Sequence, residues 1–140
     1  MTPQQIELVQ SSFAKVVPIA AAAAAMFYAR LFEIAPRVKP LFRGDMTEQG
    51  RKLMMTLGVV VNGLKNLDAI VPVAQALAVK HVGYGVKAGD YAPVGEALLW
   101  TLQQGLGEAY TAEVAAAWTT AYATLSSVMI AAAYGEEAVA

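Results

Sequence analysis

His81 is the only histidine in the chain, and it limits the metal and acid–base chemistry that the side chains can support. A protein zinc site uses three or four nitrogen, sulfur or carboxylate ligands, and the sequence offers neither a second histidine nor clustered carboxylates. The absence of cysteine excludes disulfides, iron–sulfur clusters and thiol catalysis. No serine lies in a G-x-S-x-G motif, and Gly83-Tyr84-Gly85 lacks the strand and following motif of a nucleotide-binding loop, so it predicts a turn. Of the metal sites that proteins use, a single histidine can still support one in which a cofactor needs only one protein ligand.

A haem is such a cofactor, because its porphyrin supplies four of the metal's donor atoms. A haem pocket also needs long apolar helices around a flat hydrophobic group. The chain has this composition: 57% of its residues are hydrophobic and 15% are charged, which predicts a large apolar interior or an apolar group held inside it. The histidine alone does not decide between haem binding and a structural role, because a histidine on the apolar face of a helix is more often a core residue bonded to the backbone.

The elements that must position these residues are helices. Helix-forming residues dominate, and no hairpin dipeptide separates alternating strands, so we expect an all-α fold of six to eight helices. Thr2-Pro3-Gln4-Gln5 predicts the first helix start, because it combines an N-cap, a proline at the first helical position and a capping-box glutamine. Asp45 is expected to cap a later helix that runs to about Asn66. Other expected elements are a short helical turn from Pro36 to Phe42, a helix opened by Pro72 and broken by Gly83, and helices at about Pro93–Gly107 and Thr111–Tyr134.

The net charge and the hydropathy of the chain argue against two classes of binding partner, nucleic acids and membranes. Ten basic and eleven acidic residues give a net charge of -1, so no electrostatic footprint for nucleic acid is present. The uncharged stretch between Glu113 and Glu136 is long enough to span a bilayer, but it contains several serines and threonines and no basic cluster flanks it. We therefore expect a core helix and no membrane partner. The first residues lack the basic region of a signal peptide, which predicts a cytoplasmic protein.

Several segments, taken together, resemble the globin family, in the right order and spacing from Pro3 to about Tyr134. They are Phe27-Tyr28-Ala29-Arg30-Leu31-Phe32, Pro36 with Pro40-Leu41-Phe42, Gln49-Gly50-Arg51-Lys52-Leu53-Met54, Leu77 to Val86, Tyr91 to Leu99, and Ala117-Trp118 with Tyr122. The pattern is similar to bacterial single-domain globins, to the globin domains of flavohaemoglobins and to neuroglobin. The resemblance implies one globin domain over residues 1–140, with a globin fold around haem b (iron protoporphyrin IX).

The resemblance also implies a role for individual residues. His81 would bind iron on the proximal side, with its other ring N–H donating to a backbone carbonyl. Tyr28 and Gln49 match the distal positions, and Leu53, one turn after Gln49, faces the same cavity. Phe42 is similar to the globin phenylalanine that packs flat on the porphyrin. The further cofactor contacts implied are Leu77, Val86, Tyr91 and Val94 as proximal wall residues, and Lys52, which either reaches a haem propionate or is a solvated lysine.

The function implied by the resemblance is reversible binding of oxygen, with nitric oxide and carbon monoxide as further ligands. The phenol O–H of Tyr28 and the amide N–H of Gln49 would stabilise the partial negative charge of bound oxygen. Glutamine does not coordinate iron as a distal histidine does, so we expect an open sixth position in the ferrous form, unlike neuroglobin. In the ferric form, either Tyr28 or a water is expected at that position.

Two departures from flavohaemoglobins bear on enzyme activity. Flavohaemoglobins carry flavin and NAD domains after the globin, and no such domain is expected within residues 1–140. Their proximal histidine is bonded by a glutamate on the last helix, whereas the matching region here reads Ala131-Ala132-Ala133. The imidazole should then have less imidazolate character, which weakens peroxidase-like chemistry. Nitric oxide dioxygenation with an external reductase remains the alternative function, because it needs only bound oxygen and a reductant.

Two further classes stay open beside oxygen storage, delivery or scavenging. A gas sensor carries an output domain, which is not expected here. A haem-free helical module that binds a lipid or a partner helix would be colourless when it is expressed with iron and haem. We expect an oxygen-binding protein rather than an enzyme.

Overall fold

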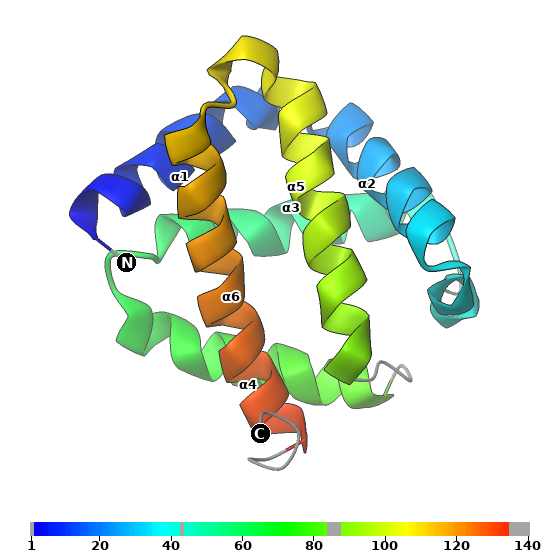
Figure 1. Cartoon of the computed structure of the whole chain (residues 1–140). Helices are drawn as coiled ribbons and strands as arrows, with labels where there is room; N and C mark the ends of the chain where they lie inside the picture. The colour runs from blue at the N-terminus through cyan, green and yellow to red at the C-terminus, as the bar shows by residue number, and fades with distance from the viewer. Residues whose placement is uncertain (1, 43, 84–87, 135–140) are drawn as a thin grey trace.

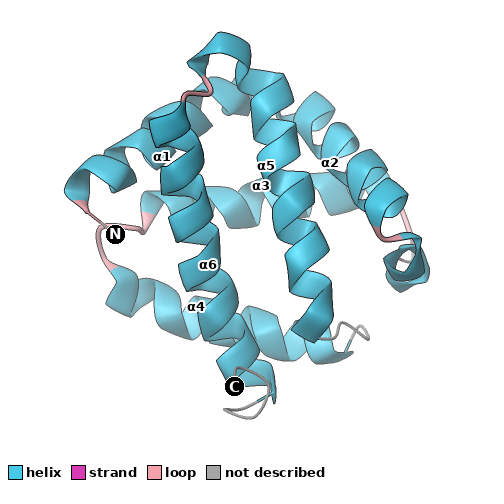
Figure 2. Ribbon diagram, in the orientation of Figure 1, coloured by secondary structure: helices cyan, strands magenta, loops and turns pink. Residues whose placement is uncertain are grey.

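The computed structural model describes residues 2–42, 44–83 and 88–134, and within them it contains six α-helices and no strand (Figures 1 and 2). The helices are α1 (Pro3–Val16), α2 (Ala20–Ile34), α3 (Met46–Asn62), α4 (Leu67–Gly83), α5 (Tyr91–Leu106) and α6 (Ala112–Tyr134). Short 3-10 helices lie at Val17–Ile19, Pro36–Leu41, Ala88–Asp90 and Gly107–Ala109. The expected all-α architecture is confirmed.

Two helix starts lie where the capping residues predict them. The hydroxyl of Thr2 accepts from the backbone N–H of Gln5 at 3.1 Å, and Oε1 of Gln5 accepts from the backbone N–H of Thr2 at 3.0 Å. This is the complete capping box, which satisfies two backbone donors at the start of α1. At the start of α3, the carboxylate of Asp45 accepts from the backbone N–H of Thr47 at 2.8 Å.

The boundary between α3 and α4 differs from the expectation. Helix α3 ends at Asn62 instead of about Asn66, and α4 begins at Leu67, so Pro72 lies inside α4 and does not open it. The chain turns at Gly63, where an added Cβ would collide with the side chain of Ile70. Close packing of the Ile70 side chain on the turn at Gly63 therefore accompanies this boundary. Pro72, which lacks an N–H, leaves one helical hydrogen bond unmade in the second turn of α4.

The last two helices also begin and end close to the expected residues. Helix α5 starts at Tyr91, two residues before Pro93, and stops at Leu106, where Gly107 has a φ of 55°. That left-handed value favours glycine at the end of a helix. Helix α6 starts at Ala112, and the hydroxyl of Thr111 accepts from the backbone N–H of Val114 at 3.2 Å.

The helices pack as crossing pairs, with α2 against α5 and α3, α1 against α6, and α4 against α6 (Figure 1). Helices α2 and α3 approach closely at Gly50, where an added Cβ would lie 2.9 Å from the Cβ of Ala24. In Figure 1, α3 crosses behind α5 and α6, whereas α4 lies below α3 at the lower end of α6. The ribbons of α3 and α4 are therefore well separated.

The core consists of two clusters of buried side chains. The larger cluster joins α1, α2, α3, α5 and α6 and contains Phe13, Phe27, Tyr28 and Trp118. The smaller cluster contains Ala74 and Ala78 of α4, Tyr91 of α5 and Met129 of α6. Helix α4 is thus held by its own small core at the end of α6.

Two stretches of the described chain, Pro3–Ile34 and Ala112–Ala132, are long and apolar enough to cross a membrane by length and composition alone. The core helix of a soluble protein passes the same test. Helix α6 packs here through Val114, Ala117 and Trp118, which are buried against other helices.

Candidate haem site

His81 lies in the last turn of α4, and its side chain is half-buried. Its Nδ1 lies 2.8 Å from the carbonyl oxygen of Leu77, one turn earlier on the same helix. Because a carbonyl only accepts, Nδ1 carries the proton and Nε2 carries the lone pair that can bind a metal. The predicted hydrogen bond from the histidine to a backbone carbonyl is confirmed.

Tyr91, the first residue of α5, packs beside this imidazole. The two rings are stacked, with centroids 6.5 Å apart and planes inclined by 23°. The backbone carbonyl of Tyr91 accepts a hydrogen bond of 2.6 Å from the hydroxyl of Tyr122 on α6. The sequence pattern predicts Tyr122 in the last helix and assigns it no role. Tyr91 is thus fixed between the imidazole and α6.

Tyr28 and Gln49 come together from two crossing helices. Tyr28 is buried in the middle of α2, and Gln49 is half-buried in the first turn of α3. Burial raises the pKa of the Tyr28 phenol, and a hydrogen bond with the side chain of Gln49 opposes that increase. The side chains of Tyr28 and Gln49 therefore lie within reach of each other where α2 and α3 cross.

Phe42 follows the 3-10 helix Pro36–Leu41 and joins an aromatic cluster at Tyr28. The rings of Tyr28 and Phe42 meet edge to face, with centroids 5.2 Å apart. Phe32 packs on both, at 6.0 Å from Tyr28 and 5.4 Å from Phe42. Such contacts restrict the orientation of the Tyr28 ring.

The other predicted cofactor contacts fall into three groups. Leu53 and Val94 are half-buried at the edge of the larger core cluster, and Leu77 is half-buried at the edge of the smaller one. Lys52 is exposed on α3. Val86 lies outside the described residues.

This set of residues fits a haem. One imidazole can bind a single metal position, and the half-buried leucines, valine and phenylalanine are apolar groups that the protein's own core covers only in part. Two neutral hydrogen-bonding groups, Tyr28 and Gln49, complete the set. Among the described residues, no three histidines, cysteines or carboxylates gather in a way that could hold a metal ion directly.

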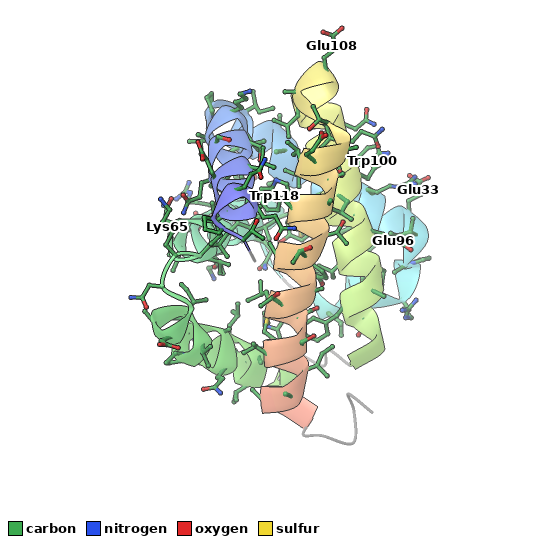
Figure 3. The ribbon with its side chains drawn as sticks, turned by 60° about the vertical axis from the view of Figure 1, so that its left-hand side comes forward. Glu33, Lys65, Glu96, Trp100, Glu108 and Trp118 are labelled. Atoms are coloured by element: carbon green, nitrogen blue, oxygen red, sulfur yellow. The ribbon has the colours of Figure 1, made fainter. Side chains whose placement is uncertain are left out.

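Two small apolar cavities lie in the larger core cluster. Leu57, Leu98 and Trp118 line both of them, and Leu53 lines one. Trp118 lies between α1 and α6 in Figure 3, whereas Trp100 with Glu33 and Glu96 lies at the outer edge of the molecule. One of the two cavities therefore lies between Leu53 and Trp118.

The fold and the site together define a helical protein with one histidine available to bind a haem. The globin family model matches residues 25–129 of the chain. The flavohemoproteins of Bordetella parapertussis and Halalkalibacterium halodurans are both 34% identical to it over 107 residues, which is 74% of this chain but 27% and 26% of the relatives. A bacterial globin from Campylobacter jejuni has a solved structure with a TM-score of 0.82 and 25% identity, covering 94% of this chain and 96% of that one.

The chain belongs to the globin family, and it is a haem protein that binds diatomic gases. It spans about a quarter of the length of the flavohemoproteins that it matches. The predicted family and fold are confirmed. The roles of individual site residues remain predictions.

Proposed function

We propose that this globin binds oxygen reversibly at a ferrous haem b, with His81 as the iron ligand and Tyr28 and Gln49 as the groups that stabilise oxygen. The observation that carries the proposal is the meeting of Tyr28, buried in the middle of α2, with Gln49 in the first turn of α3, which places two neutral polar side chains together in a largely apolar region. The cytoplasmic location and a role in oxygen storage, delivery or scavenging belong to the same proposal.

When bound, the haem supplies a ferrous iron with one position for a diatomic gas. The Tyr28 O–H and the Gln49 amide N–H are the two groups that would donate to a gas on the distal side. The raised pKa keeps this phenol protonated, and therefore a donor, at neutral pH. A neutral hydrogen bond contributes about 0.5–1.5 kcal/mol net, so two such bonds slow oxygen release by roughly one to two orders of magnitude.

The remaining residues hold and enclose the cofactor in this proposal. His81 binds through Nε2, because its Nδ1–H donates to Leu77. Leu53, Val94 and Phe42 cover the porphyrin with apolar surface. Lys52 is exposed to solvent, and in this proposal its side chain contacts a haem propionate. A neutral backbone acceptor gives His81 less imidazolate character than a carboxylate does, so we expect weak peroxidase activity.

Nitric oxide dioxygenation is the second candidate function. It is supported by the similarity to flavohemoproteins, which covers the part of them that matches this chain. In this case a separate reductase would supply electrons, and the Tyr28–Gln49 pair would stabilise oxygen before it reacts with nitric oxide. Reductant-fed turnover of nitric oxide to nitrate by the purified protein separates the two functions.

The absorption spectrum of the ferric, dithionite-reduced and oxygenated protein tests the main proposal. A strong Soret band, and a single broad visible band on reduction, are the expected results for haem on His81 with an open ferrous position. Two sharp visible bands in the reduced protein would contradict the open position, and no Soret band after haem addition would contradict haem binding.

A matched pair of variants tests the ligand. His81→Gly should lose the spectrum of the histidine-bound protein and regain it on addition of imidazole, which replaces the missing side chain. Lys80→Ala, at the neighbouring exposed position, should leave the spectrum unchanged. If His81→Gly keeps the wild-type spectrum without imidazole, His81 is not the ligand.

A further inference from the structure

We propose that the ion pair between Arg37 and Asp90 ties the 3-10 helix Pro36–Leu41 to the start of α5 and thereby positions Phe42 against Tyr28. Both charged residues are positioning residues, because they act on the distal side through the Phe42 ring. The inference rests on the proposed role of Tyr28 as a donor to bound oxygen. It assigns control over oxygen release to two side chains outside the aromatic cluster.

The ion pair joins an exposed cation to a buried carboxylate. Nε of Arg37 lies 3.5 Å from Oδ1 of Asp90, and the two side chains are 62% and 11% exposed. A buried carboxylate is costly unless cations or hydrogen-bond donors compensate its charge. By contrast, Arg51 pairs with Glu48 within α3, where both side chains are exposed and the pair contributes little. The Arg37–Asp90 pair is therefore the stronger candidate for a structural restraint.

The pair connects two segments that are distant in the sequence. Asp90 is the last residue of the 3-10 helix Ala88–Asp90 and lies at the N-cap position of α5. Its side chain makes no capping hydrogen bond with the backbone of that helix. Arg37 belongs to the segment after α2, which packs mainly on α2 itself. The ion pair thus links this segment to the residue that precedes α5.

The 3-10 helix Pro36–Leu41 is a stiff segment that leads directly to Phe42. Pro36 and Pro40 fix φ at two of its six positions. The backbone N–H of Phe42 donates to the carbonyl of Lys39 at 3.1 Å, so the last turn closes on the phenylalanine. A displacement of this helix therefore displaces Phe42 as well.

Two neighbouring residues fix the segment on its two sides. Val38 is buried in the larger core cluster, and Arg37 reaches Asp90. The Phe42 ring meets the Tyr28 ring edge to face, with centroids 5.2 Å apart. Without the ion pair, the segment is held by Val38 alone, and Phe42 restricts the Tyr28 ring less. Because the direction of the phenol O–H depends on that ring, we expect bound oxygen to be released faster.

Hydrogen exchange measures the restraint directly. Arg37→Gln and Asp90→Asn each remove one charge and keep a polar side chain of similar shape. The amides of Val38 and Phe42 bond to carbonyls in or next to the segment, so their exchange in the carbon monoxide-bound protein, followed by NMR, reports its local opening. We expect both amides to exchange about ten-fold faster in either variant, with the amides of α1 unchanged. Arg51→Gln, at an equally exposed arginine, is the matched control and should change neither amide.

Oxygen release measures the consequence for the distal side. Arg37→Gln and Asp90→Asn should each release oxygen about two- to five-fold faster, and the double variant should be no faster than the single ones. Arg37→Lys keeps the charge and should lie between Arg37→Gln and the wild type. Raising the ionic strength from about 0.01 M to about 1 M should speed release in the wild type but not in Arg37→Gln. An arginine that acts only by packing would give the same salt dependence in both proteins.

The outcomes separate this inference from the proposed function. Unchanged exchange of the two amides in Arg37→Gln and Asp90→Asn would show that the pair does not hold the segment, and the inference is then wrong. Faster exchange with an unchanged rate of oxygen release would make the pair purely structural, which also overturns the inference. If Tyr28→Phe leaves oxygen release unchanged, the proposed role of Tyr28 fails, and the inference fails with it.

Discussion

Trp118 of α6 donates its indole N–H to the hydroxyl of Ser12 on α1 at 2.8 Å, across 106 residues of sequence. Both side chains are buried, and the Ser12 hydroxyl lies 2.6 Å from the carbonyl oxygen of Leu8. The hydroxyl thus donates to the backbone and accepts from the indole. The Ser12 hydroxyl thus gives the buried indole N–H of Trp118 its hydrogen-bond acceptor.

Ser12→Ala should destabilise the fold by about 1–3 kcal/mol, because it leaves the Trp118 N–H buried without this acceptor. Urea denaturation measures the difference. Ser11→Ala is the control at the adjacent exposed position, and it should stay within about 0.5 kcal/mol of the wild type. In a Trp118→Phe background, Ser12→Ala should cost less, since no indole N–H remains. Equal costs in the two backgrounds would show that the bond contributes little.

Tyr28→Phe should speed oxygen release at least several-fold, because it removes the phenol donor and keeps the ring in its aromatic cluster. Stopped-flow displacement of oxygen by carbon monoxide measures the rate. Carbon monoxide is less polar when bound, so its own release rate should change less. An unchanged oxygen release rate would contradict the proposed distal role of Tyr28.

Gln49→Leu tests whether the two distal residues act as a pair. The leucine removes the amide, so both its direct contribution and its effect on the neighbouring Tyr28 phenol are lost. We expect faster oxygen release, and the combined effect of Gln49→Leu and Tyr28→Phe should be smaller than the sum of the separate effects in free energy. Strict additivity in the double variant would indicate two independent donors.

The helix starts could be predicted from the sequence because the interactions that fix them are local. The cap of α1 is complete between Thr2 and Gln5, and that of α3 involves Asp45 and Thr47. The end of α3 could not be predicted in the same way. It depends on Gly63 packing against Ile70, a contact that exists only once both helices have formed.

The same distinction between local sequence signals and tertiary contacts applies to the residues of the candidate site. Tyr28, Gln49 and His81 could be chosen from the sequence because each lies in a family motif. The sequence assigned no role to Tyr122, because nothing local distinguishes it among six tyrosines. The hydrogen bond of the Tyr122 hydroxyl joins α6 to the start of α5. The Tyr122 ring packs on α5 at Gly95, where a larger residue would collide with it.

The buried tyrosines make stability depend on alkaline pH. Burial raises the pKa values of Tyr28, Tyr110 and Tyr122 above the ordinary value of 10.0, so the folded protein keeps phenol protons that the unfolded chain releases. Their contribution is fully present below pH 10.0 and is lost as the pH rises, because the unfolded state then binds fewer protons than the folded state.

We therefore expect the free energy of unfolding to fall between about pH 10 and pH 12, by up to about 1.4 kcal/mol per pH unit for each fully buried phenol. Tyr122→Phe should flatten this decline, because phenylalanine has no proton to release in the unfolded chain. Tyr110→Phe should flatten it less, since Tyr110 is less buried. Urea titrations at several pH values measure the slope, and an alkaline slope identical in Tyr122→Phe and the wild type would show that Tyr122 ionises alike in the folded and unfolded states.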